Sequence, residues 1–115
     1  MNTRRLSAIL VADVVGFSAQ MERDDAGTLA RLRAIRGEVV DPAIAESGGR
    51  VVKTTGDGFL AEFGSADASL RCAVSIQRAL AGRNALLQAD DRLELRIGIN
   101  LGDVIAEGDD IFGDG

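Results

Sequence analysis

A nearly unbroken apolar run near the start of the chain constrains the fold more than any other feature. Residues 6–15 read Leu-Ser-Ala-Ile-Leu-Val-Ala-Asp-Val-Val, which is typical of a central strand buried on both faces. The run is shorter than the ~20 apolar residues that cross a bilayer, and it lacks a signal-peptide cleavage site, so we expect no membrane span here. Its one acid, Asp13, comes shortly before Gly16-Phe17-Ser18, which should end the strand. We therefore expect a buried strand that carries a carboxylate to its own end.

The remaining sequence alternates between helical and strand patterns. Helical spacing with a bend at Pro42, a Gly-Asp-Gly connection typical of a hairpin, and a clean polar–apolar alternation follow one another along the chain. The order strand, helix, strand, strand, helix, strand predicts an α+β, ferredoxin-like (split βαβ) antiparallel sheet with helices on one face. The expected helices span about 24–46 and 65–83, and the expected strands span 6–15, 50–53, 59–63 and 93–101, with 104–106 and 111–112 starting a further hairpin.

The composition excludes several kinds of chemistry. Histidine, tryptophan and tyrosine are absent, which removes Ser-His-Asp and Cys-His catalysis and imidazole metal sites. A net charge of −5 leaves no basic stripe for nucleic acid, so we expect no such partner. The single Cys72 and the missing signal peptide favour a reducing, cytoplasmic environment. A partner that carries phosphate would need positive charge from elsewhere, and a divalent cation is the natural source.

Two acids fall where strands end. In a ferredoxin-like sheet the first strand lies beside the central hairpin, so Asp13 and Asp57 can reach the same edge. Two carboxylates that close would repel unless cations held them, and a magnesium pair suits phosphoryl transfer. The backbone N–H groups of Gly16, Phe17 and Ser18 could then cradle phosphate oxygens. Taken singly, each acid has a simpler interpretation, since Asp13 can bond to turn N–H groups and Gly-Asp-Gly is an ordinary turn.

Four ordered segments resemble the catalytic domain of class III nucleotidyl cyclases, and the likeness is nearest to bacterial adenylate cyclases. They cover nearly the whole chain, and four motifs in order are far more specific than any one of them. The segments are Val-Ala-Asp-Val-Val-Gly-Phe-Ser at 11–18, Val-Lys-Thr-Thr-Gly-Asp-Gly-Phe at 52–59, Arg-Ile-Gly-Ile-Asn-Leu-Gly-Asp-Val at 96–104 and Asp-Ile-Phe-Gly-Asp-Gly at 110–115.

The resemblance implies a role for each matching residue. Asp13 and Asp57, with the backbone carbonyl of Val14, would hold two Mg²⁺ (or Mn²⁺) ions per site. Lys53 and Asp110 would read the purine, because lysine donates to adenine N1 and aspartate accepts from the N6 amine, whereas guanine presents the opposite pattern. The implied reaction converts ATP to 3′,5′-cyclic AMP and pyrophosphate for intracellular signalling, in a homodimer whose two sites lie between subunits. Taken singly, Lys53 reads as a solvated strand lysine and Asp110 as a loop acid.

The resemblance also has departures. Asp103 stands where some members have a phosphate-binding arginine. The family motif continues past Gly115 with an Asn and an Arg, so we expect residues 1–115 to be a cyclase domain incomplete at its C-terminus, with weak or no activity alone.

Three other interpretations remain. One is a catalytically silent cyclase-like module that binds nucleotide or dimerises, against which the retention of both Asp13 and Asp57 argues. Another is a diguanylate cyclase, which the Thr-Gly-Asp-Gly-Phe sequence at 55–59 disfavours. The last is a purely structural ferredoxin-like domain, which leaves the four motifs unexplained.

Overall fold

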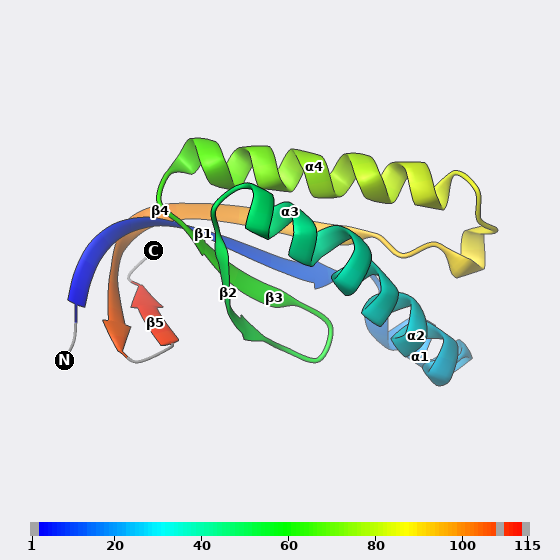
Figure 1. Ribbon diagram of the computed structural model, residues 1–115. Helices are drawn as coiled ribbons and strands as arrows, with labels where there is room; N and C mark the ends of the chain where they lie inside the picture. The colour runs from blue at the N-terminus through cyan, green and yellow to red at the C-terminus, as the bar shows by residue number, and fades with distance from the viewer. Residues whose placement is uncertain (1–2, 108–109, 114–115) are drawn as a thin grey trace.

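A computed structural model describes the backbone of residues 3–107 and 110–113 and the side chains of residues 6–102. Strands and helices alternate in the expected order (Figure 1). The elements are β1 (Thr3–Val14), α1 (Phe17–Arg23), α2 (Asp25–Ile35), the π-helical η1 (Arg36–Val40), α3 (Asp41–Glu46), β2 (Arg50–Thr54), β3 (Phe59–Phe63), α4 (Ala66–Asn84), the 3₁₀ turn η2 (Ala89–Asp91), β4 (Leu95–Glu107) and β5 (Asp110–Gly113).

The strands form one sheet in the order β2-β3-β1-β4-β5, and every neighbouring pair is antiparallel. The first four strands follow the ferredoxin-like order, so the predicted fold class is confirmed. β1 is central, and it pairs with β4 along its whole length, from Thr3 opposite Ala106 to Val14 opposite Leu95. On its other side β1 pairs with β3, with Ala12 opposite Phe59. The end of β1 therefore lies beside the β2–β3 hairpin.

The helices cover one face of the sheet, which we call the helix face. α4 packs against β1, β3 and β4, while α3 packs against α4 and β2. Leu10, Ala12 and Val14 of β1 point into this layer and are buried, whereas Val11 between them is 48% exposed. Burial on both faces of β1 was therefore a wrong expectation, because no layer covers the second face of this strand at Val11. We call that second face the open face.

The predicted helix over 24–46 is one helical stretch with a change of pitch. α2 passes into η1 and then α3, and the N–H of Asp41 bonds the carbonyl of Arg36 five residues back. Pro42 lies in α3 directly after this π-turn, and an interruption of the regular hydrogen-bond ladder is where a helix accommodates a residue without an N–H. Asp24 caps α2 by accepting from the N–H of Gly27 at 2.9 Å. α1 was not expected, because the sequence between Gly16 and Asp24 is too short to show a helical period.

The C-terminal end of the sheet curls strongly. Residues 104–106 belong to β4 itself, and β4 then pairs with β5 in the expected hairpin. β4 bends away from α4 towards its C-terminal end (Figure 1). As a result β5 comes into contact with β2, although the two strands stand at opposite ends of the sheet order. Within the described residues, no helix has both the length and the apolar character to cross a membrane.

Leu10 tests how much the central strand contributes to stability. Its side chain is fully buried at 0% exposure, whereas Leu86, after α4, is 88% exposed. We expect Leu10→Ala to lower the free energy of unfolding by about 3–5 kcal/mol through lost burial and a cavity. The matched change Leu86→Ala should stay within about 0.5 kcal/mol of the unaltered chain. Urea unfolding followed by circular dichroism measures both, and equal losses would contradict this description of the core.

Candidate active site at the end of the first strand

The register of the sheet decides which polar side chains share the open face. Asp13 stands opposite Arg96, Val11 stands opposite Leu60, and Leu60 stands opposite Lys53. Partners in an antiparallel ladder project to the same face, and so do residues two apart on one strand. Asp13, Arg96 and Lys53 therefore all lie on the open face. The predicted metal residue and the predicted purine residue of one chain project to one side of the sheet.

Asp13 is held by a two-pronged ion pair. The Nε of Arg96 donates to Oδ1 of Asp13 at 3.0 Å, and Nη2 donates to Oδ2 at 3.0 Å. The side chain of Arg96 is 72% exposed and that of Asp13 is 41% exposed, so the pair faces solvent. Arg96 was not singled out from the sequence. The sequence did contain a signal for its orientation. Arg96 occupies a polar position of the alternating run, between Leu95 and Ile97, so its side chain is expected to face away from the core.

Asp57 lies at the tip of the hairpin between β2 and β3, and the hairpin is fixed through Gly58. The N–H of Thr55 donates to the carbonyl of Gly58 at 2.9 Å, which closes the turn. The guanidinium of Arg36, from η1, donates to the same carbonyl at 3.2 Å. Arg36 thus ties the hairpin to the helical layer, a link that the sequence did not reveal.

Gly58 also brings the hairpin against β1. A Cβ at this position would stand 2.0 Å from the carbonyl oxygen of Ala12 and 3.2 Å from the Cα of Asp13. Both neighbouring atoms belong to backbone, so they cannot move aside as a flexible side chain would. Glycine is therefore required here for the hairpin tip to lie this close to the end of β1.

The charges around Arg96 act in one direction. The pKa of Arg96 is raised, chiefly by its hydrogen bond to Asp13, then by the charge of Asp13, and further by the charge of Asp57. Asp57 precedes Gly58, whose backbone packs against the backbone of Ala12 and Asp13. The hairpin tip that bears Asp57 therefore lies beside the end of β1.

The turn after β1 has the backbone that the predicted phosphate cradle needs. Gly16 adopts a left-handed conformation, with φ of 67°, and precedes the first residue of α1. Residues other than glycine rarely adopt this φ. A Cβ at this position would meet nothing within 4 Å, so the backbone conformation, and not lack of space, favours glycine. The side chain of Phe17 packs against the core and anchors the turn, whereas Ser18 is exposed.

The two purine-reading candidates lie on β2 and β5, the two edge strands of the sheet. Lys53 is exposed on β2 beside a bulge between Val51 and Lys53. Asp110 is the first residue of β5, and its side chain lies outside the described residues. Because β5 contacts β2, the two strands that carry these candidates are neighbours in space.

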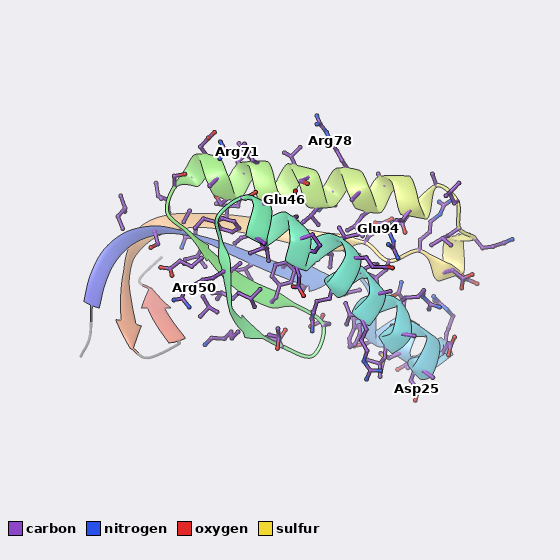
Figure 2. All side chains as sticks on the ribbon, viewed as in Figure 1. Asp25, Glu46, Arg50, Arg71, Arg78 and Glu94 are labelled. Atoms are coloured by element: carbon purple, nitrogen blue, oxygen red, sulfur yellow. The ribbon has the colours of Figure 1, made fainter. Side chains whose placement is uncertain are left out.

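Another carboxylate on the open face, that of Glu62, has a structural role. Glu62 is 6% exposed and accepts from the hydroxyl of Ser7 at 2.7 Å. Arg50, labelled in Figure 2, donates to its other oxygen at 3.1 Å. A buried carboxylate must be paired in this way, which makes Glu62 part of the framework. Asp13 and Asp57 differ because they reach solvent more freely.

The donor set at the end of β1 suits a hard divalent cation. Mg²⁺ prefers oxygen ligands and is commonly bound by one or two carboxylates, with water and substrate phosphates completing its shell. Asp13 and Asp57 supply carboxylates, and the backbone of Val14 continues directly from Asp13. Among the described residues there is no cluster of three or more acidic, cysteine or histidine side chains that would form a self-sufficient metal cage.

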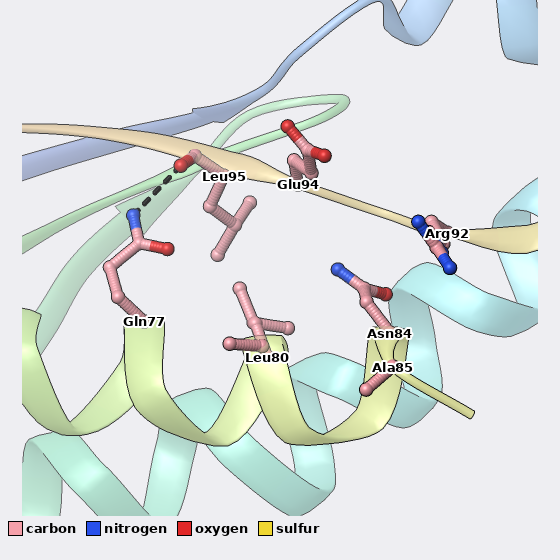
Figure 3. Close-up of a pocket in the computed structure, with 8 residues that line it drawn as sticks. Gln77, Leu80, Asn84, Ala85, Arg92, Glu94 and Leu95 are labelled. Carbon is pink, nitrogen blue, oxygen red and sulfur yellow. Dashed lines mark hydrogen bonds between the residues drawn. The ribbon is translucent and has the colours of Figure 1, made fainter. Parts of the chain in front are cut away.

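Cavities also lie on the helix face, away from these residues. Figure 3 shows one of about 360 Å³ between the end of α4 and the start of β4, where Gln77 donates to the carbonyl of Leu95 at 2.9 Å. Another, of about 500 Å³, is an apolar groove between α4 and β4 that includes Leu70, Val74 and Ile99. Asp13, Asp57 and Lys53 line neither of these two cavities.

Comparisons with known proteins find similarity to nucleotide cyclases. The profile of the adenylate and guanylate cyclase catalytic domain matches residues 2–114. A protein of Rhizobium meliloti (strain 1021) named "Putative adenylate cyclase 3" is 50% identical over 112 residues. The crystal structure of an adenylate/guanylate cyclase/hydrolase from Silicibacter pomeroyi superposes with a TM-score of 0.92 at 51% identity. That of the guanylyl cyclase Cya2 superposes with a TM-score of 0.74 at 34% identity.

The matched region is a part of each relative. It covers 97% of this chain and 19% of the Rhizobium protein. It covers 99% of this chain and 66% of the Silicibacter chain, and 90% of this chain and 57% of Cya2.

Glycine substitutions test the close approach of the hairpin. Gly58→Ala should lower the free energy of unfolding by about 1–3 kcal/mol, since its methyl group would overlap the backbone of Ala12. Gly56→Ala is the matched control, because a Cβ at 56 meets nothing within 4 Å, and it should leave stability unchanged or raise it by up to about 1 kcal/mol. Thermal unfolding of the two variants compares them, and equal tolerance of both would show that the tip does not touch β1.

Proposed function

Because the chain belongs to the adenylate and guanylate cyclase catalytic domain family, we propose that it converts ATP to 3′,5′-cyclic AMP and pyrophosphate. The approach of the β2–β3 hairpin to the end of β1 carries this proposal, because the packing of Gly58 against the backbone of Ala12 and Asp13 brings the segment that bears Asp57 beside Asp13. The name of the Rhizobium relative, which is 50% identical, supports ATP as the substrate.

Asp13, Asp57 and the carbonyl of Val14 would hold two divalent ions, Mg²⁺ or Mn²⁺. When bound, such ions lower the pKa of the attacking ribose 3′-hydroxyl and neutralise charge on the triphosphate. Asp57 is presented by a hairpin that Arg36 fixes from the helical layer, so this carboxylate is held in position before substrate arrives. Such preorganisation is where an enzyme of this kind gains most of its rate.

The backbone after β1 would meet the phosphates. In the left-handed turn at Gly16 the chain reverses into α1, and N–H groups at the first turn of a helix have no partner within the helix. Gly16, Phe17 and Ser18 can therefore offer N–H groups to phosphate oxygens. The anchoring of Phe17 in the core keeps this cradle in place.

Lys53 and Asp110 would select adenine over guanine. A lysine ammonium donates to adenine N1, and a carboxylate accepts from the N6 amine. Guanine would present a donor to the lysine and an acceptor to the carboxylate. The polar groups of the site would then be left unpaired, which lowers the affinity for the wrong base strongly. The contact between β2 and β5 supports the joint action of these two residues. A guanylyl cyclase among the structural relatives makes base selection the property to test.

The active site would lie between two copies of the chain. The open face carries Asp13 and Lys53, and it also exposes the apolar side chain of Val11. A symmetric homodimer through this face would place the metal acids of one subunit opposite the purine residues of the other, and so form two equivalent sites.

The acids can be tested directly in the longest natural chain that contains these residues. With ATP and Mn²⁺, Asp13→Asn or Asp57→Asn should lower cyclic AMP formation at least about a hundredfold, the scale on which loss of one electrostatic contact to the transition state acts. Asp25→Asn, at the exposed start of α2 (Figure 2), is the matched control and should keep full activity. Normal turnover by Asp13→Asn would refute the metal assignment. Retained ATP binding without product in the unaltered chain would favour a silent nucleotide-binding module.

Mixing two inactive variants tests whether the sites are shared. Asp13→Asn and Lys53→Glu would each be impaired alone, but a mixed dimer contains one site made of two intact halves. We expect mixing to restore up to about a quarter of the unaltered activity, since half of the dimers are mixed and each holds one good site of two. Cyclic AMP formation against mixing ratio gives the measurement. No recovery on mixing, in variants shown to dimerise, would place each site within a single subunit.

A further inference from the structure

Arg96 and Asp13 form a pair that the sheet itself enforces. They stand directly opposite each other in the β1–β4 ladder, where Cα atoms are about 4.5–5.5 Å apart. The guanidinium can rotate away from Asp13, because its side chain is 72% exposed, but it cannot leave the neighbourhood. Any ion or ligand that binds the carboxylate of Asp13 therefore does so next to the guanidinium of Arg96.

The pair occupies the atoms that a metal ion would need. Both oxygens of Asp13 accept a hydrogen bond from Arg96, each at 3.0 Å. A carboxylate bound in this two-pronged way has fewer lone pairs and less net negative charge to offer a divalent ion. The guanidinium and the metal thus require the same oxygens.

We propose that Arg96 is a positioning residue that holds Asp13 in place in the metal-free protein and is displaced from Asp13 when a divalent cation binds. The proposal rests on the function proposed above, because it takes Asp13 as a metal ligand. It adds that Arg96 competes with the metal ion for the carboxylate of Asp13. The affinity for the metal then depends on the cost of displacing the guanidinium as well as on the metal ligands themselves.

The exchange also explains how Asp13 can stay ionised near the hairpin that bears Asp57 when no metal is bound. The guanidinium that binds Asp13 offsets the repulsion between nearby carboxylates. Arg96 also disfavours the binding of free metal ions, because each ion must displace a guanidinium that makes two charge-assisted hydrogen bonds. An ion that arrives with a nucleotide has phosphate ligands in addition, and so displaces Arg96 more readily than the free ion does.

Mn²⁺ binding without nucleotide tests the exchange, using paramagnetic resonance of the free ion. Arg96→Met keeps the length of the side chain and removes its charge, so it should tighten Mn²⁺ binding by about three- to tenfold. Arg96→Lys keeps the charge but loses the two-pronged bond, and should fall between. Arg78→Met is the matched control, because Arg78 is exposed on α4 and points away from the sheet (Figure 2), and it should leave the affinity unchanged.

The outcomes separate this proposal from the proposed function. Unchanged or weaker Mn²⁺ binding by Arg96→Met, with Asp13→Asn still abolishing binding, would overturn the exchange and leave the metal site standing. If Asp13→Asn binds Mn²⁺ as the unaltered chain does, the metal site itself is wrong. A second readout needs no stable Arg96→Met variant. The Arg96 Nε–H signal in nitrogen NMR, identified by its loss in Arg96→Lys, should shift on adding Mg²⁺, and a signal that stays in place would equally overturn the exchange.

Discussion

The register of β1 against its two neighbours is the constraint on which the rest of the molecule depends. β1 pairs with β3 on one side and with β4 over its full length on the other, so its faces are fixed from both directions. A slip of one residue would turn Leu10 and Ala12 to the open face and bring Asp13 into the core. An unpaired carboxylate there would be costly. One alignment therefore determines both where the core forms and where the charged end of the sheet faces.

Much of the fold could be predicted from residue patterns, and the failures have physical reasons. β3 has the bounds expected from its apolar run, and α4 begins after Ser65, whose hydroxyl accepts from the N–H of Ala68. The extension of β4 through residues 104–106 was missed because the glycine at 102 and the acid at 103 read as a turn. The uncovered face of β1 could not be foreseen, since an apolar strand gives no sign of which layers will cover it.

For the site, the sequence predicted that the segments bearing Asp13 and Asp57 would come to one edge of the sheet, and Gly58 indeed packs against the end of β1. It did not reveal the arginine that binds Asp13. The pairing of Asp13 with Arg96 depends on the β1–β4 register, which no single motif encodes. That these acids bind metal, and that Lys53 and Asp110 read a base, stay predictions. Arg96 is one of 13 basic residues in a chain of net charge −5, and its ladder position opposite Asp13 places it at the candidate site.

The wide turn at η1 has a consequence for how this chain tolerates change in length. A π-turn is a helix with one residue more than a regular helix needs, and such turns often occur at functional sites. Deleting one residue from 37–40 would let the helix close regularly, so its own hydrogen bonding would suffer little. The residues on either side would keep their facing, because the five residues of the π-turn and the four of the α-turn that replaces it each complete about one turn. Arg36 would still face the carbonyl of Gly58, so the hairpin that bears Asp57 would keep its link to the helical layer after such a shortening.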